Sequence, residues 1–220
     1  MNYDLGYIAG LIDAEGSIFI SKHMFGGKAY FYPRISVSNT NLQILHFLEQ
    51  IGGKARIQPM DSKFGSKQVW VWALQQQHAI LSLLENISPY LIVKRGNAVA
   101  VLGHDVVSVL PSWSYIAGVL DGDGSVTVTR NNYKYWRVDV RLVTVCEELA
   151  LALVEKCGGN FCIRQPAGIS KKIQFLWQSY RQRRNRVILE NILPYAIEKR
   201  AAVERALTCL ASLSGWRKYA

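Results

Sequence analysis

Two acidic residues stand at the same place in a stretch of sequence that the chain carries twice. Residues 7–17 and 115–125 are identical at seven of eleven positions, and the acids are Glu15 and Asp123. Each stretch is predicted to form a short apolar helix that ends at its acid. A carboxylate at a helix C-terminus faces the negative end of the helix dipole, which costs roughly 0.3–1 kcal/mol. A cation held between the two acids would remove that cost, so we expect a metal site there.

Small residues predict how the two helices pack. In each copy one small residue lies four positions before another, which places both on one helix face. A face without bulky side chains lets a second backbone approach closely. If the helices pair in the same direction, the two acids meet at one end. The small pairs are Gly10 with Ala14 and Gly118 with Gly122.

The glycine that follows each acid, Gly16 or Gly124, is expected to end its helix in a left-handed turn. The alternative interpretation is a pair of ordinary core helices with glycine stops, which leaves the acids without a role. Asp13 and Asp121 also match each other, but they lie before the position that a pocket needs. We interpret them as hydrogen-bonding residues of the helix or of the interface.

The bulk properties favour a basic, folded protein with a polyanionic partner. The chain has 220 residues, half of them hydrophobic, and a formal net charge of +10, which suits nucleic acid. The sequence contains no run of about 18 uncharged apolar residues, so we expect no membrane span. The four cysteines form no C-x-x-C pair, so neither a zinc site nor a disulfide framework is indicated. A reducing intracellular compartment, prokaryotic cytoplasm or organelle interior, fits best.

The order of predicted elements repeats behind each motif, which makes the chain a pseudo-dimer of the α+β class. Each half reads as helix, two strands, helix, two strands and closing helices. We predict an N-terminal repeat over 1–102, a linker over 103–112 and a C-terminal repeat over 113–220. Within the first half, Tyr30 to Ser38 alternates between a polar, aromatic face and an apolar face that carries Phe31, Pro33, Ile35 and Val37.

The outward faces of these strands are the candidate nucleic-acid surface. Basic and aromatic side chains on a two-stranded ribbon can enter a major groove of DNA, although any one of them could equally belong to a solvated strand face. The residues expected to bind DNA are Ser21, Tyr30, Tyr32, Arg34, Ser36, Lys54 and Arg56 in the first half, and Thr127, Thr129, Arg137, Asp139, Arg141 and Arg164 in the second.

Paired carboxylates beside a nucleic-acid surface point to phosphodiester hydrolysis. Carboxylate and carbonyl oxygens suit a hard divalent ion, Mg²⁺ by default, with Mn²⁺ as a substitute. Such an ion activates water and stabilises the leaving oxygen. Lys94 and Lys199 occupy equivalent places in the repeat and could stabilise developing charge at the phosphate. The alternative is that each lysine only begins a surface helix.

The stretches 8–16 and 116–124 resemble the LAGLIDADG motif, and the chain resembles a single-chain, two-motif LAGLIDADG homing endonuclease. The resemblance covers nearly the whole chain. It implies two pseudo-symmetric αββαββα halves packed through the motif helices, with antiparallel sheets forming a saddle over double-stranded DNA. It also implies a monomer that cuts both strands of a long, nearly asymmetric site with a divalent metal and leaves short 3′ overhangs.

The resemblance also implies roles for single residues. Glu15 and Asp123 match the family's metal-binding acids, with Ala14 and Gly122 adding backbone carbonyls. The family's basic residue after its proline-aromatic element falls on Lys94 and Lys199.

One position departs from the family's pattern. At the end of the second strand, where the family often has a polar residue that orients water, we place Asn39 in one half and Cys146 in the other. Cys146 is a poor substitute, so either the two DNA strands are cut at different rates or Glu147 or Glu148 serves in its place.

Three other functions compete with the endonuclease. An RNA maturase, with intron RNA as its partner, or a non-catalytic DNA-binding protein could share the fold, but degenerate acids would favour them and both acids are present. A metal hydrolase of small phosphates would leave the large basic faces unused.

Overall fold

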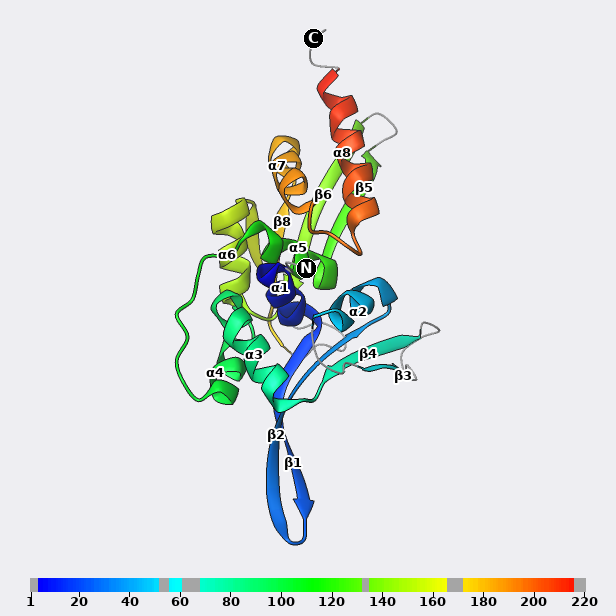
Figure 1. The fold of residues 1–220 in the computed structure, drawn as a ribbon. Coiled ribbons are helices and arrows are strands. Elements are labelled where there is room, and N and C mark those ends of the chain that lie inside the picture. The colour runs from blue at the N-terminus through cyan, green and yellow to red at the C-terminus, as the bar shows by residue number, and fades with distance from the viewer. Residues whose placement is uncertain (1–3, 52–55, 61–67, 132–134, 166–171, 216–220) are drawn as a thin grey trace.

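The computed structural model describes residues 4–51, 56–60, 68–131, 135–165 and 172–215 (Figure 1). The side chains of 56–60, 131, 135 and 213–215 lie outside that description. The first half contains α1 (Leu5–Glu15), β1 (Gly16–Phe25), β2 (Lys28–Asn39), α2 (Leu42–Glu49), β3 (Arg56–Met60), β4 (Val69–Leu74), α3 (Gln77–Ile87), a 3₁₀ turn η1 (Ser88–Tyr90) and α4 (Arg95–Leu102).

The second half repeats this order with α5 (Trp113–Asp123), β5 (Gly124–Asn131), β6 (Tyr135–Thr144), α6 (Glu147–Cys157), β7 (Asn160–Arg164), β8 (Gln174–Ser179), α7 (Gln182–Ile192) and α8 (Arg200–Gly215). The predicted α+β class and the repeated element order are confirmed. No described helix is long and apolar enough to span a membrane.

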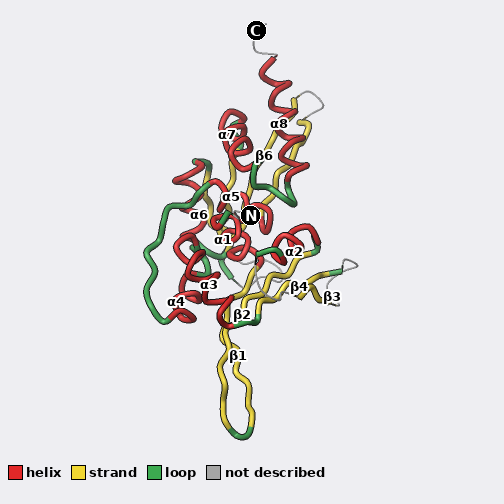
Figure 2. The backbone as a smooth tube through the Cα atoms, in the orientation of Figure 1, coloured by secondary structure: helices red, strands yellow, loops and turns green. Residues whose placement is uncertain are grey.

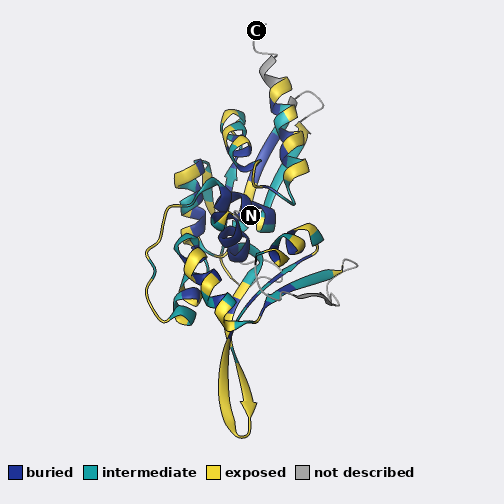
Figure 3. Cartoon of the chain, in the orientation of Figure 1, coloured by how far each residue is buried: buried dark blue, intermediate teal, exposed yellow. Residues whose placement is uncertain are grey.

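The motif helices α1 and α5 form the centre of the molecule (Figure 3). A Cβ added to Gly10 would overlap the carbonyl oxygen of Tyr115, and one added to Gly118 would overlap that of Tyr7. The helix starts also lie together, with Gly6 against Ser114, and so do the helix ends, with Gly122 against Ala14, so the predicted close, same-direction pairing is confirmed. Each helix starts at a capping side chain, since Asp4 accepts hydrogen bonds from two backbone amides of α1 and Ser112 accepts one from α5.

Two antiparallel sheets lie on opposite sides of the helix pair (Figure 1). Their strand orders are β1-β2-β4-β3 and β5-β6-β8-β7. Alternate residues of β2 and β6, such as Ile35, Val37, Val138 and Val140, are completely buried beneath helices. The opposite faces carry the polar and basic side chains, so the predicted alternation holds over the bases of both sheets.

The helix ends differ from the expectation at Gly16 and Gly124. Both have extended backbones, with φ near −89° and −83°, so neither makes a left-handed turn. Glycine serves another purpose here, because a Cβ on Gly16 would lie 2.7 Å from the carbonyl oxygen of Ile12. A Cβ on Gly124 would lie 2.5 Å from Leu120. The chain passes directly from helix to strand, and only glycine fits that close passage.

The β1–β2 hairpin projects beyond the rest of the molecule (Figures 1 and 2). Phe31 was expected on the covered face but is 63% exposed, whereas Pro33 on the same face is buried. The reason is the covering helix. In the first half α4 has only 8 residues and reaches the hairpin base, while the 16 residues of α8 run along β5 and β6.

The segment that joins the halves begins at Gly103, which ends α4 in a left-handed conformation with φ of 77°. Residues 104–112 form neither helix nor strand and cross one side of the molecule before α5 begins (Figure 2). The division into domains at 102 and 113 stays a prediction.

Candidate functional site

The two predicted metal-binding acids end α1 and α5 where these helices touch. Their proximity shows at Gly122, where a Cβ would overlap Ala14 and would lie 2.9 Å from Cγ of Glu15. Close contact between the helix ends therefore depends on the missing side chain at Gly122. Two carboxylates and two negative helix ends converge at this point.

The electrostatics of Glu15 reflect this crowding. Its pKa is raised to about 7, first by desolvation and then by the nearby carboxylates of Asp123 and Glu198. The ammonium groups of Lys199 and Lys94 act in the opposite direction. Desolvation also raises the pKa of Asp123, against the same two lysines. A partly desolvated pair of acids with two lysines beside it is an arrangement that a divalent cation would stabilise.

Both predicted lysines lie at this site. Nζ of Lys94 donates a hydrogen bond to the backbone oxygen of Asp13, and desolvation lowers the pKa of Lys94. Nζ of Lys199 donates to the backbone oxygen of Asp121 at 3.2 Å and also pairs with Glu198. The two sides therefore differ, because Glu198 adds a carboxylate next to one lysine.

Sequence reasoning missed Glu198. Its only signal is its place directly before Lys199, where the first half has Val93 before Lys94.

Asp13 and Asp121 are confirmed as interface hydrogen-bonders, since each accepts a 2.8 Å hydrogen bond from a tyrosine of the opposite motif helix. Burial, followed by the adjacent carboxylate, raises the pKa of Tyr7 and Tyr115, so both phenols remain proton donors at neutral pH. Each aspartate also accepts hydrogen bonds from backbone amides just before α4 or α8.

The expected equivalence of Asn39 and Cys146 is wrong. Asn39 is the last residue of β2 and accepts a hydrogen bond from the amide of Asn41 at 2.7 Å. The same bond in the second half runs from the amide of Cys146 to Oγ1 of Thr144, at 3.1 Å. Asn39 therefore corresponds to Thr144, and Cys146 corresponds to Asn41.

The offset between the halves explains this error. It is 108 residues from Gly16 to Gly124 but 105 residues from Val37 to Leu142, so the change falls inside the first hairpin. Both halves therefore end their second strand in a polar side chain.

The first sheet presents a connected polar face. Nε of Arg34 donates to Oγ of Ser21 at 3.0 Å, and a second guanidinium nitrogen lies 3.1 Å from Nε2 of His23. Tyr30 and Tyr32 are exposed on the same face. Sequence reasoning missed His23, which the alternation from Ser21 could have identified. Ser36 continues this face at the sheet base, whereas Lys54 and the side chain of Arg56 lie outside the described residues.

Residues of the second sheet line an open cavity of about 700 Å³. Its lining includes five of the predicted positions, Thr129, Arg137, Asp139, Arg141 and Arg164, together with the unpredicted Arg130, Cys162, Leu176, Gln178 and Tyr180. The hydroxyl of Thr127 is buried on the same face and has no hydrogen-bond partner among the described residues. Four arginines among these residues, Arg130, Arg137, Arg141 and Arg164, make the cavity basic.

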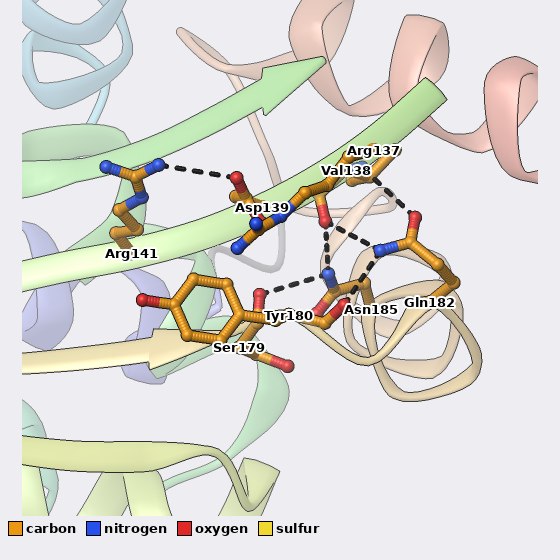
Figure 4. A network of polar contacts seen from close by, with 8 residues as sticks. All are labelled: Arg137, Val138, Asp139, Arg141, Ser179, Tyr180, Gln182 and Asn185. Carbon is orange, nitrogen blue, oxygen red and sulfur yellow. Dashed lines mark hydrogen bonds and ion pairs between the residues drawn. The ribbon is translucent and has the colours of Figure 1, made fainter. Parts of the chain in front are cut away.

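Asp139 organises the arginines of this cavity (Figure 4). It is 3% exposed, and its oxygens lie 2.7 Å from Nε of Arg137 and 3.3 Å from a guanidinium nitrogen of Arg141. The guanidinium of Arg137 also lies 4.4 Å above the ring of Tyr180. Asp139 thus orients two cations toward the cavity, and the direct DNA contact expected of it stays a prediction.

The other side of the same strand is held by α7 (Figure 4). The side-chain nitrogen of Asn185 donates to the carbonyl oxygens of Val138 and Ser179, at 2.7 Å and 3.1 Å. Gln182 both donates to Val138 and accepts from its amide. These bonds tie β6 to α7 next to Arg137.

The donor chemistry at the helix ends fits a hard divalent cation, because carboxylates and free helix-terminal carbonyls converge there. Within the described part of the chain, no cluster of three or more His, Cys, Asp or Glu side chains could hold a metal. The assignment of Glu15 and Asp123 as metal ligands stays a prediction.

No protein-family model matches the sequence, and no curated protein matches it either. Solved structures match it well. The structure of the LAGLIDADG homing endonuclease I-GzeII in complex with its DNA target has 13% identity and a TM-score of 0.70, and covers 100% of this chain and 94% of that one.

A second endonuclease matches in two states. I-SmaMI bound to uncleaved DNA with calcium ions has 14% identity and a TM-score of 0.67, covering 98% of this chain and 93% of that one. I-SmaMI bound to cleaved DNA has 13% identity and a TM-score of 0.67, covering 98% and 91%. Over its whole length, this chain therefore has the fold of the LAGLIDADG homing endonucleases.

Proposed function

We propose that the protein is a site-specific endonuclease that binds a long, nearly asymmetric stretch of double-stranded DNA and hydrolyses one phosphodiester in each strand, leaving short 3′ overhangs. The observation that carries this proposal is the juxtaposition of Glu15 and Asp123 at touching helix ends, with a lysine beside each side. A basic sheet face flanks the site in each half.

The acids would hold Mg²⁺ or Mn²⁺, with the carbonyls of Ala14 and Gly122 as further ligands. A divalent ion held there supplies Lewis-acid chemistry at a phosphate. The chain's own residues contribute the rest. Lys94 and Lys199 place positive charge where negative charge develops on phosphate oxygens. Asn39, at the end of β2, would orient water in its half, and Thr144 would do so in the other.

The strand faces would read the DNA. Arginine pairs well with guanine in the major groove, and Asp139 presents Arg137 and Arg141 in a fixed orientation toward the cavity. Arg34 is fixed in the same way by Ser21 on the first sheet. Because one chain supplies both halves, the active form would be a monomer that carries two different reading surfaces.

Replacement of the acids tests the proposal. A randomised library of DNA duplexes, incubated with the protein and Mg²⁺, should yield a selected cleavage site. On that site Glu15→Gln and Asp123→Asn should abolish cleavage while DNA binding persists, because the isosteric amides keep the fold but lose the charges that hold the metal. Glu155→Gln on the exposed side of α6 is the matched control and should cut normally.

Two results would contradict the proposal. Unchanged cleavage by both acid variants would show that the acids have no catalytic role. Binding to DNA without any cleavage by the wild-type protein would instead favour a non-catalytic DNA-binding protein or an RNA maturase of this fold.

A further inference from the structure

An aspartate in each half holds the backbone segment that carries the lysine of the same half. Asp13 holds the segment of Lys94, and Asp121 holds that of Lys199. Asp13 accepts hydrogen bonds from the amides of Ile92 at 2.6 Å, Val93 at 3.0 Å and Lys94 at 2.8 Å. The ammonium group of Lys94 then folds back onto the carbonyl of Asp13 itself. One residue of α1 therefore fixes both ends of Lys94.

The second half repeats this anchor with its own residues. Asp121 accepts hydrogen bonds from the amides of Ile197 at 2.6 Å and Lys199 at 2.8 Å, and its carbonyl accepts one from Nζ of Lys199. The described structure thus contains the same device twice, which makes an accidental set of contacts an inadequate explanation.

A tyrosine completes each anchor from the other half. The hydroxyl of Tyr115 on α5 donates to Oδ2 of Asp13, and that of Tyr7 on α1 donates to Oδ2 of Asp121, both at 2.8 Å. All four side chains are buried at the helix interface, between 0% and 3% exposed. The connections therefore cross between the halves, since the tyrosine of one half supports the lysine segment of the other.

We infer that Tyr7 and Tyr115 are positioning residues of the proposed nuclease, and that each sets the placement of the lysine in the opposite half. Tyr115 supports Lys94 through Asp13, and Tyr7 supports Lys199 through Asp121. This assignment rests on the proposed function for its catalytic consequence. The lysine segment stays in place only while its aspartate remains fully hydrogen-bonded and fixed in orientation.

Removal of one phenol oxygen isolates the effect. In Tyr115→Phe the ring still fills its space, but Oδ2 of Asp13 loses a buried donor and its hold on the Lys94 segment loosens. The lost hydrogen bond to Asp13 and the displaced ammonium group of Lys94 should slow cleavage about tenfold on the DNA strand whose cleavage depends on Lys94. Tyr7→Phe should slow the strand that Lys199 serves by a similar factor.

An assay that measures the cleavage of each DNA strand separately tests these crossed connections. Single-turnover cleavage of a duplex with a different label on each strand gives one rate per strand. Lys94→Met and Lys199→Met first identify the strand that depends on each lysine. The two phenylalanine variants act as matched controls for one another, because they make the same chemical change on opposite sides of one interface. Tyr115→Phe should share the strand preference of Lys94→Met, and Tyr7→Phe that of Lys199→Met.

Two strand patterns would overturn the inference. One is a phenylalanine variant that slows the strand assigned to its own half's lysine. The other is a pair of variants that slow both strands equally, which is the result of a merely structural role.

Amide hydrogen exchange provides a readout that needs no cleavage. Tyr115→Phe should speed exchange at Ile92–Lys94 more than at Ile197 and Lys199, and Tyr7→Phe should do the reverse. Uniform or absent changes would refute the positioning role. If the wild-type protein cuts no DNA, the proposed function fails, while exchange still decides whether the tyrosines hold the opposite segments.

Discussion

At the scale of residues, the acids of the site are held in an unfavourable state. Glu15 ends a helix at its negative pole, beside Asp123 and Glu198, and its pKa is raised to about 7. A raised pKa means that the folded protein disfavours the charged form of Glu15 more than the unfolded chain does. Binding of a cation would offset that penalty, so the proposed metal site would give up stability in return for metal affinity.

This penalty has a pH dependence with a definite sign. Below about pH 4.5 Glu15 is protonated in both states and costs nothing, whereas above pH 7 it is ionised in both and the full penalty applies. Without metal, Glu15→Gln should therefore raise the free energy of unfolding by about 1–2 kcal/mol at pH 8, after allowance for solvent screening, and by little at pH 4. Urea denaturation at both pH values measures it, and an equal effect at both would contradict this origin.

At the scale of elements, the molecule depends on contact between two helix backbones. Gly118 faces the carbonyl oxygen of Tyr7, and Gly10 faces that of Tyr115, with no room for a methyl group. The packing is backbone to backbone, which cannot relax by a change of rotamer. The same contact sets the distance between the helix ends and thus between the acids.

Addition of one methyl group tests this contact. Gly118→Ala should lower the free energy of unfolding by about 3 kcal/mol, because overpacking forces the helices apart. Gly96→Ala in α4 is the matched control, since nothing lies within 4 Å of its Cβ position and alanine favours helix. The control should be neutral or slightly stabilising in thermal unfolding. Equal effects of the two substitutions would refute the close approach.

Much of this arrangement could be predicted from the sequence, because identical residues at a fixed offset identify equivalent positions. The helix pair, the acids and the lysines all belong to that class. The equivalence of Asn39 with Thr144 could not be predicted, since the offset changes inside a hairpin whose strands alternate regularly on both sides of the change. The burial of Asp139 depends on two arginines that reach it from its own strand, which alternation alone does not reveal.

At the scale of the whole molecule, one feature distinguishes the halves. The strands of the first hairpin have 10 and 12 residues, whereas β5 and β6 have 8 and 10 in the described part of the chain. Among the described residues, no long helix covers the far end of the first hairpin, and its tip residue Phe25 is 79% exposed. The hairpin of the first half is therefore the longer of the two in the described structure.

The difference in hairpin length should change how far the protein contacts DNA on each side of the cut. Two extra residues per strand extend a ribbon by roughly 7 Å, which equals about two base-pair steps. The footprint should thus be off-centre, with protection reaching about two base pairs farther from the cut on the side of the first half. Hydroxyl-radical footprinting measures both reaches. Removal of Met24 and Ala29, a paired rung near the tip, should shorten the longer reach by about one base pair and leave the other unchanged.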